Sequence, residues 1–168
     1  MQNKSAERVG VGKLEHFRID FADTNANPQY YSSRWNGSPA TIVEHQNSIV
    51  YGAVWKLNLA DVEELDRQEG VESCIYKPIS LKVYVESLER EITCRSYQLV
   101  FNPKILLDPV SREEARQPSK TYLTVIVNGA IESKLPETYV NFLKTFKHNG
   151  KYATDSDFIE KLSLKNVL

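Results

Sequence analysis

Several features that would point to a particular environment or partner are scarce in this 168-residue sequence. Its only two cysteines, Cys74 and Cys94, are too far apart for a CxxC redox motif or a zinc knuckle. We therefore expect free thiols in a reducing compartment, with a single disulfide as the alternative. The formal net charge of −1 argues against a nucleic-acid or polyanion partner. No segment reaches the roughly 18 uncharged apolar residues of a membrane span, and the first residues lack a signal-peptide core. These shortages predict a protein without a membrane partner, located in the cytoplasm.

What the sequence does contain is typical of a globular protein. Apolar residues make up 41% and charged residues 26%, and the length suffices for a core that needs no disulfide or metal. We expect one domain over residues 1–168. The three histidines, His16, His45 and His148, are scattered without metal-ligand spacing, so no metal site is predicted.

Alternating apolar residues predict strands in the first two-thirds of the chain. The expected strands cover residues 8–22, 40–45, 49–56, 75–86 and 90–101. The polar stretch 46–48 is interpreted as a hairpin turn between the second and third strands, and the last two strands also resemble a hairpin. Gly10 and Gly12 indicate a bulge or bend in the first strand.

Helical patterns lie between and after the strands. Asn58 is expected to cap a helix that runs to about Arg67 and stops at Gly70. Residues 121–133 carry strand-forming residues at helical spacing, and we favour a helix, whereas Pro136 opens a clearer one. The tail after Asp155 predicts a short helix, and the proline-rich connection 102–119 has a length often associated with function. The order predicts an α+β fold, a small, largely antiparallel sheet or β-barrel with flanking helices.

An acid-rich run precedes Gly70. It contains five carboxylates and one cation: Asp61, Glu63, Glu64, Asp66, Glu69 and Arg67. Neighbouring negative charges and the negative end of a helix would raise the pKa of Glu69, and a carboxyl with a raised pKa suits proton transfer near neutral pH. From composition alone, a solvated helix surface is the more common explanation.

Other chemistry has weaker support. A dyad of Cys74 with a histidine would allow hydrolysis, although thiols of this kind are more often inert. Trp35 and Trp55 are interpreted as core or loop-packing residues.

Five stretches together resemble the γ-glutamylcyclotransferase family. They are RWNGSPATIV (34–43), VYGAVWKLN (50–58), LDRQEGVESCIY (65–76), EITCRSYQL (91–99) and PSKTYLTVIVNGAIESKLPETYVNFL (118–143). The spacing from QEG to the tyrosine, together with ITCRSY, resembles the branch that acts on γ-glutamyl amino acids. The resemblance covers nearly the whole chain from about Ser5 to Phe146.

The resemblance implies a function and a site. The implied reaction closes a 5-oxoproline ring and releases a free amino acid, without metal or cofactor. The family's catalytic glutamate matches Glu69, and its substrate-binding tyrosine matches Tyr122, with Tyr76 as a second substrate neighbour or a core aromatic. The family also implies a mixed α+β barrel, a homodimer and a place in glutathione metabolism.

One family feature is not found in this sequence. The family pattern begins with a strand and turn close to FAYGSN, which hold the γ-glutamyl group. We therefore expect a domain that is truncated at its N-terminus relative to that pattern. The enzyme is the first hypothesis, and the alternative is a non-catalytic binding or interaction module.

Overall fold

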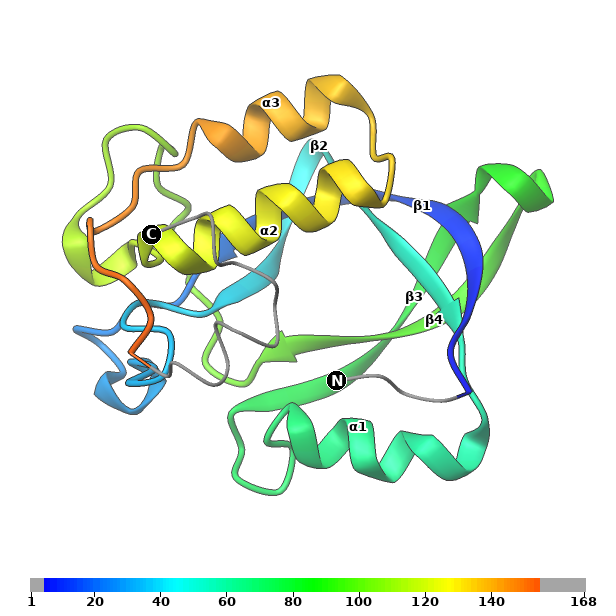
Figure 1. Cartoon of the computed structure of the whole chain (residues 1–168), viewed down its shortest axis with the longest axis horizontal. Helices are drawn as coiled ribbons and strands as arrows, with labels where there is room; N and C mark the ends of the chain where they lie inside the picture. Colours follow the sequence, from blue (N-terminus) through cyan, green and yellow to red (C-terminus); the bar gives the residue numbers. More distant parts are fainter. Residues whose placement is uncertain (1–4, 155–168) are drawn as a thin grey trace.

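The structure is a computed structural model that describes residues 5–154. The described residues form four strands and three α-helices: β1 Glu7–Phe21, β2 Ala40–Lys56, α1 Val62–Gln68, β3 Tyr76–Val85, β4 Arg90–Leu99, α2 Lys120–Glu132 and α3 Glu137–Lys144. The sheet lies between α1 at one end and the α2–α3 pair at the other (Figure 1). The predicted α+β class is confirmed, and the expected tail helix lies outside the described residues.

The sheet consists of two antiparallel strand pairs in the order β2-β1-β3-β4. β1 pairs with β2 along its whole length, and β3 pairs with all of β4. β1 and β3 pair only at Gly12–Val85 and Lys13–Tyr84. A Cβ on Gly12 would lie 2.6 Å from Val83 Cγ1 on β3 and 2.7 Å from Val54 Cγ2 on β2, so glycine permits β3 to approach β1 here. A register shift between Arg8 and Gly10 confirms the predicted bulge.

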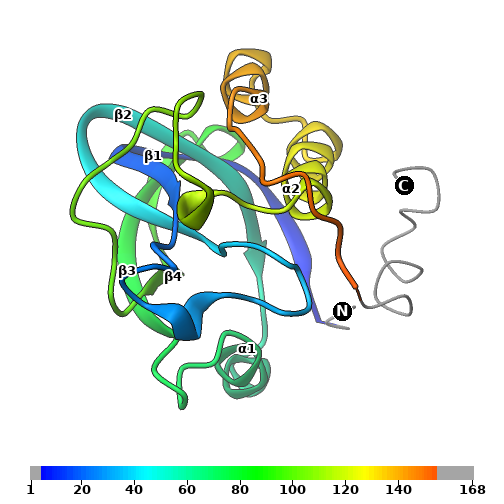
Figure 2. The same cartoon turned by 90° about the vertical axis from the view of Figure 1, so that its left-hand side faces the viewer.

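The sheet curls into an incomplete barrel (Figure 2). Its two edge strands are joined by side chains rather than by a β ladder. The amides of Gln98 and Asn102 each donate to the Ile42 carbonyl at 2.9 Å, and Leu99 N donates to Thr41 Oγ1 at 3.2 Å. These contacts hold the end of β4 against the beginning of β2.

The predicted turn at residues 46–48 is wrong. β2 is one strand of 17 residues, and both of its halves pair with β1. The register jumps from Glu15–Ile49 to Phe17–Glu44, with left-handed φ values of +62° at His16 and +66° at Asn47. The polar residues therefore form a large bulge. A hairpin there would have left the two halves of β2 paired with each other.

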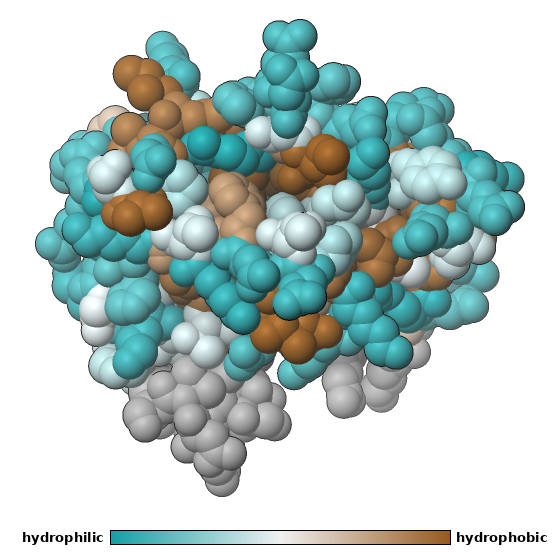
Figure 3. Space-filling view, turned by 90° about the horizontal axis from the view of Figure 1, so that it is seen from above, coloured by the Kyte–Doolittle hydropathy of each residue, from teal (hydrophilic) through white to brown (hydrophobic). Residues whose placement is uncertain are grey.

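The helices agree with the sequence pattern. The conflicted segment is helix α2, capped by the Ser119 hydroxyl, which accepts from Tyr122 N at 3.1 Å. Pro136 is the N-cap of α3, and the buried Tyr139 and Leu143 of that helix pack toward β1 and β2. Seen from above, the outer face of this helix pair is mostly hydrophilic, with small apolar patches (Figure 3).

The long connection 102–119 is held by a buried ion cluster. Asp20 is fully buried, and its two oxygens accept from Arg112 Nη1 and Arg116 Nη2, each at 2.9 Å. Arg18 adds a third guanidinium at 3.5 Å. Arg116 also donates to the carbonyls of Phe21 and Ile105. The connection, whose helical part is the 3₁₀ turn Glu114–Arg116, is thus fastened to the end of β1.

Candidate active site

Glu69 lies at the end of α1, as the sequence predicts. Gly70 follows with a φ of +67° and stops the helix. Its N–H donates to the Arg67 carbonyl at 3.2 Å, and Val71 N donates to the Asp66 carbonyl at 3.0 Å. This pair of bonds is a Schellman motif, which fixes the backbone of Glu69 between them. Asn58 begins the preceding 3₁₀ turn, but its side chain makes no capping bond.

Burial raises the pKa of Glu69 above its usual value of 4.5. The direction agrees with the expectation from the sequence, but the cause is burial rather than neighbouring negative charge, and the nearby Asp66 and Glu64 pair with cations. Asp66 binds Arg95 and Tyr97, which lower the pKa of Asp66, and Glu64 pairs with Arg67. Within residues 5–154, the Glu69 carboxylate has no hydrogen-bond or ion-pair partner of its own. Its raised pKa is therefore a property of its half-buried position.

Two tyrosines from distant segments meet at the backbone of Ala40. Tyr76, at the start of β3, donates its hydroxyl to the Ala40 carbonyl at 2.6 Å. Ala40 N donates to the hydroxyl oxygen of Tyr122, in the first turn of α2, at 3.3 Å. The hydroxyl proton of Tyr76 is therefore engaged in a hydrogen bond, whereas the hydroxyl proton of Tyr122 has no acceptor among the described residues.

The structure brings Tyr76 and Tyr122 together at Ala40, and the charge of Glu69 acts on the pKa of both. Burial raises the pKa of Tyr76, with smaller contributions from Tyr122 and Glu69. Burial also raises the pKa of Tyr122; its hydrogen bond from Ala40 acts in the opposite direction, and the Glu69 charge raises it further. The carboxylate charge thus influences the pKa of both phenols. A half-buried carboxyl beside two phenols can exchange a proton with a ligand and hydrogen-bond its oxygens.

Trp35 is a neighbour of this site that sequence reasoning treated only as a packing residue. Its ring centroid is 4.7 Å from that of Tyr122, with the ring planes tilted by 41°. Phe21 contacts Tyr122 edge-on at 6.4 Å. The position RWNG before β2 gave no signal that Trp35 would lie against a residue of α2, because that contact is made only in the folded chain.

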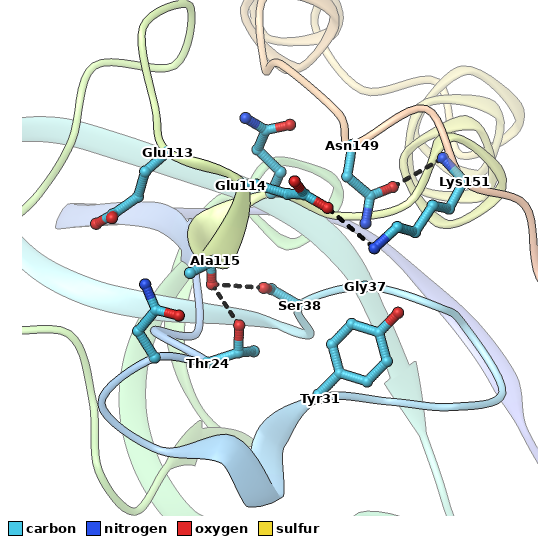
Figure 4. A pocket seen from close by; sticks show the side chains of 11 residues that line it. Thr24, Tyr31, Gly37, Ser38, Glu113, Glu114, Ala115, Asn149 and Lys151 are labelled. Carbon is cyan, nitrogen blue, oxygen red and sulfur yellow. Dashed lines mark hydrogen bonds and ion pairs between the residues drawn. The ribbon is translucent and has the colours of Figure 1, made fainter.

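Two surface cavities are lined by residues other than Glu69, Tyr76 and Tyr122. One, of about 310 Å³, lies beside residues 113–117 (Figure 4). Thr24 and Ser38 both donate their hydroxyls to the Ala115 carbonyl there, and Glu114 pairs with Lys151 at 2.9 Å. Its polar groups therefore largely satisfy one another. The second, of about 460 Å³, borders the β1–β2 bulge.

The alternatives raised by the sequence find no site in the described residues. Within residues 5–154, no three His, Cys, Asp or Glu side chains are grouped closely enough to hold a metal ion. Both cysteines are free, and Cys74 is exposed. Two of the histidine rings have partners elsewhere: His45 bonds with Ser48, and His148 accepts from Gly150 N. In the same part of the chain, no helix is long and apolar enough to cross a membrane.

Comparison with known proteins identifies the family. A model of the AIG2-like family matches residues 49–143. The chain is 37% identical over 166 residues to a protein named gamma-glutamylcyclotransferase from Bos taurus, covering 98% of this chain and 80% of that protein. It is 34% identical to the Homo sapiens protein of the same name over a similar share. The chain belongs to the AIG2-like family, and these relatives within it are gamma-glutamylcyclotransferases.

Solved structures agree with this relationship. A structure of a gamma-glutamyl cyclotransferase superposes with a TM-score of 0.79 at 34% identity, covering 98% of this chain and 88% of that one. YkqA from Bacillus subtilis superposes with a TM-score of 0.60 at 21% identity, which shows a shared fold alone.

Proposed function

We propose that this protein is an enzyme that cyclises γ-glutamyl amino acids to 5-oxoproline and releases the free amino acid. The observation that carries the proposal is the half-buried Glu69 carboxyl, with its raised pKa, close to the phenols of Tyr76 and Tyr122. Sequence identity of 34–37% with proteins named gamma-glutamylcyclotransferase, over nearly the whole chain, supports the same reaction. The alternative of a non-catalytic module is not favoured by these relatives.

In the proposed reaction Glu69 moves one proton. The α-amine of the γ-glutamyl group gives a proton to the carboxylate, and its nitrogen attacks the γ-carbonyl carbon of the same group. The bond from that carbon to the leaving nitrogen breaks, and Glu69 returns the proton to the departing amine. No water is consumed and the carboxylate is regenerated. A pKa above the usual carboxyl value brings the proton affinity of Glu69 closer to that of the groups it serves.

The two phenols have different proposed roles because their protons are used differently. The Tyr122 hydroxyl oxygen accepts a hydrogen bond from Ala40 N, and its own proton is not used in that bond. The hydroxyl can therefore donate a hydrogen bond to a substrate oxygen without adding charge to the site. Tyr76 donates to the Ala40 carbonyl, so only its oxygen lone pairs remain available to a ligand, and the same bond holds the start of β2 in place. We propose Tyr122 as the substrate donor and Tyr76 as its neighbour.

The Tyr122→Phe variant is expected to lower kcat/KM by roughly ten- to a hundredfold. The substitution removes the hydroxyl that would donate to a substrate oxygen, and hydrogen bonds to charged groups contribute about 1.5–3 kcal/mol. Steady-state kinetics with γ-glutamyl-alanine measure the change. Tyr84→Phe, at an exposed position on β3, is the matched control and should behave like the parent. A Tyr122→Phe enzyme with the parent's kcat/KM would remove Tyr122 from the proposed site.

Product analysis tests the reaction itself. The protein is incubated with γ-glutamyl-alanine in ¹⁸O-labelled water, and the products are identified by mass spectrometry. Cyclisation predicts unlabelled 5-oxoproline and alanine in equal amounts. Labelled glutamate with alanine would instead indicate hydrolysis, and an unchanged substrate would contradict the proposed function.

The proposal extends to the setting of the enzyme. We propose γ-glutamyl compounds of glutathione metabolism as the substrates, the cytoplasm as the location and a homodimer as the assembly; all three rest on the family resemblance. Sedimentation velocity of the purified protein measures the assembly directly, and a monomer at micromolar concentration would contradict the homodimer.

A further inference from the structure

The helix that carries Glu69 has little hydrophobic attachment to the rest of the protein. None of the residues of α1 is buried. Leu59, in the turn just before it, is 90% exposed. Short helices depend on tertiary packing for their stability. A helix of seven residues without a buried face therefore needs another kind of contact to stay in one orientation.

That contact is a polar clamp between α1 and β4, formed by Asp66, Arg95 and Tyr97. Arg95 Nη2 donates to both oxygens of Asp66, at 2.8 and 2.7 Å. The Tyr97 hydroxyl donates to Asp66 Oδ1 at 2.6 Å. Arg95 and Tyr97 are two residues apart and therefore project from the same face of β4. The Arg95 guanidinium also lies 5.6 Å from the centre of the Tyr97 ring, which orients both donors.

Asp66 is placed to transmit this attachment to Glu69. The two residues are three positions apart, so they lie on neighbouring sites of the helix surface. The backbone carbonyl of Asp66 also accepts from Val71 N and closes the Schellman motif around Glu69. One residue thus fixes the rotation of the last helical turn through its side chain and the helix end through its backbone.

The other end of the clamp belongs to the strand pair that carries a second site residue. β4 pairs with β3 along its length, and Tyr76, at the start of β3, lies opposite Leu99. Tyr97 lies opposite Pro78 on the same ladder. The clamp therefore ties the helix of Glu69 to the strands that position Tyr76.

We infer that Asp66, Arg95 and Tyr97 are positioning residues, which hold the Glu69 carboxyl in its half-buried place at the end of α1. Their effect on catalysis rests on the proposed function, whereas their effect on the environment of Glu69 does not. Asp66 is suited to this role because Arg95 and Tyr97 lower its pKa and keep it ionised.

The Arg95→Gln variant is expected to lower kcat by roughly a hundredfold and to leave KM within about twofold of the parent. A displacement of about 1 Å at a catalytic group is enough for such a loss, whereas Tyr122 remains in place to bind substrate. Arg95→Lys retains the positive charge but lacks the forked guanidinium group. Its kcat should therefore lie between those of the parent and Arg95→Gln. Lys151→Gln, which breaks an ion pair of similar length elsewhere, is the control and should match the parent.

A measurement independent of activity decides the inference. The ¹³C resonance of the Glu69 carboxyl is titrated by NMR in the parent, Arg95→Gln and Tyr97→Phe. Freed from the clamp, Glu69 becomes more hydrated, so its pKa is expected to fall toward 4.5 in both variants, by a smaller amount in Tyr97→Phe. Tyr97→Phe removes one hydrogen bond and no charge, so it provides a folded test even if Arg95→Gln unfolds.

The outcomes separate the positioning role from the proposed function. A fall in the Glu69 pKa supports the positioning role, even in a protein that releases no 5-oxoproline; that protein would contradict only the proposed function. An unchanged Glu69 titration in a folded Arg95→Gln or Tyr97→Phe protein would overturn the inference, whatever the activity.

Discussion

The Glu69→Gln variant is expected to release 5-oxoproline from γ-glutamyl-alanine at least 10²–10⁴ times more slowly than the parent, the range typical of a lost general acid–base group. Glutamine has nearly the same shape and fills the same half-buried position, but it cannot accept the amine proton or return one. Within residues 5–154, the Glu69 carboxylate makes no hydrogen bond that the substitution would break, so the loss should appear in turnover rather than in folding. Single-turnover kinetics at pH 7, followed by mass spectrometry of 5-oxoproline, measure it.

Glu63→Gln is the matched control for this prediction. Glu63 lies in the first turn of the same helix, but it is exposed. The same change of charge there should leave the rate unchanged. If Glu69→Gln retained more than about a tenth of the parent's rate, proton transfer by Glu69 would be excluded.

The same variant should be more stable than the parent at neutral pH. The folded-state pKa of Glu69 is raised above its usual value of 4.5, so the folded protein holds that proton more tightly than the unfolded chain. The associated stability is fully present below pH 4.5 and is lost as the pH rises through the folded-state pKa. The Tm of Glu69→Gln minus that of the parent should therefore grow between pH 4 and pH 7. A constant difference across that range would mean that Glu69 titrates normally.

Local sequence signals predicted most of the fold, and they erred where partners came from elsewhere in the chain. The β3–β4 hairpin, the stop at Gly70 and the helix opening at Pro136 each depend on residues close in sequence. The polar stretch 46–48 has turn chemistry too. It becomes a bulge because β1 offers a partner on both sides of it, and that pairing has no local signature.

The candidate site likewise has parts that the local sequence predicted and parts that depend on tertiary contacts. Glu69 at the end of α1 and Tyr122 in the first turn of α2 could be located from the sequence with the help of the resemblance. The meeting of Tyr76 and Tyr122 at Ala40, the packing of Trp35 on Tyr122 and the pairing of Asp66 with β4 are tertiary contacts. The acid-rich run illustrates the difference. The sequence suggests mutual repulsion among these carboxylates, but in the fold Glu64 and Asp66 pair with cations, and burial alone raises the pKa of Glu69.

The Asp20→Asn variant is expected to destabilise the protein by about 3–5 kcal/mol, the cost typical of breaking a buried ion pair. Asp20 is fully buried and is the carboxylate that Arg112 and Arg116 share. Asparagine would leave both guanidiniums in the interior without a counter-charge. Burial already lowers the pKa of Arg112, which indicates how poorly its surroundings solvate charge. A loss of this size is a large fraction of the roughly 5–15 kcal/mol that stabilises a domain.

Urea unfolding at pH 7 measures this loss, and two further variants identify its source. Glu114 lies on the same connection and forms an exposed ion pair with Lys151. Glu114→Gln breaks this pair and should leave the urea midpoint of unfolding unchanged. Arg112 lies against the ring of Phe146, with its guanidinium carbon 4.6 Å from the ring centre, so a methionine there would remain packed. Arg112→Met should therefore recover part of the stability when combined with Asp20→Asn, because it removes one of the uncompensated charges. Additive effects of the two substitutions, or a loss below about 1 kcal/mol for Asp20→Asn, would show that the connection is held by its backbone contacts rather than by the buried charges.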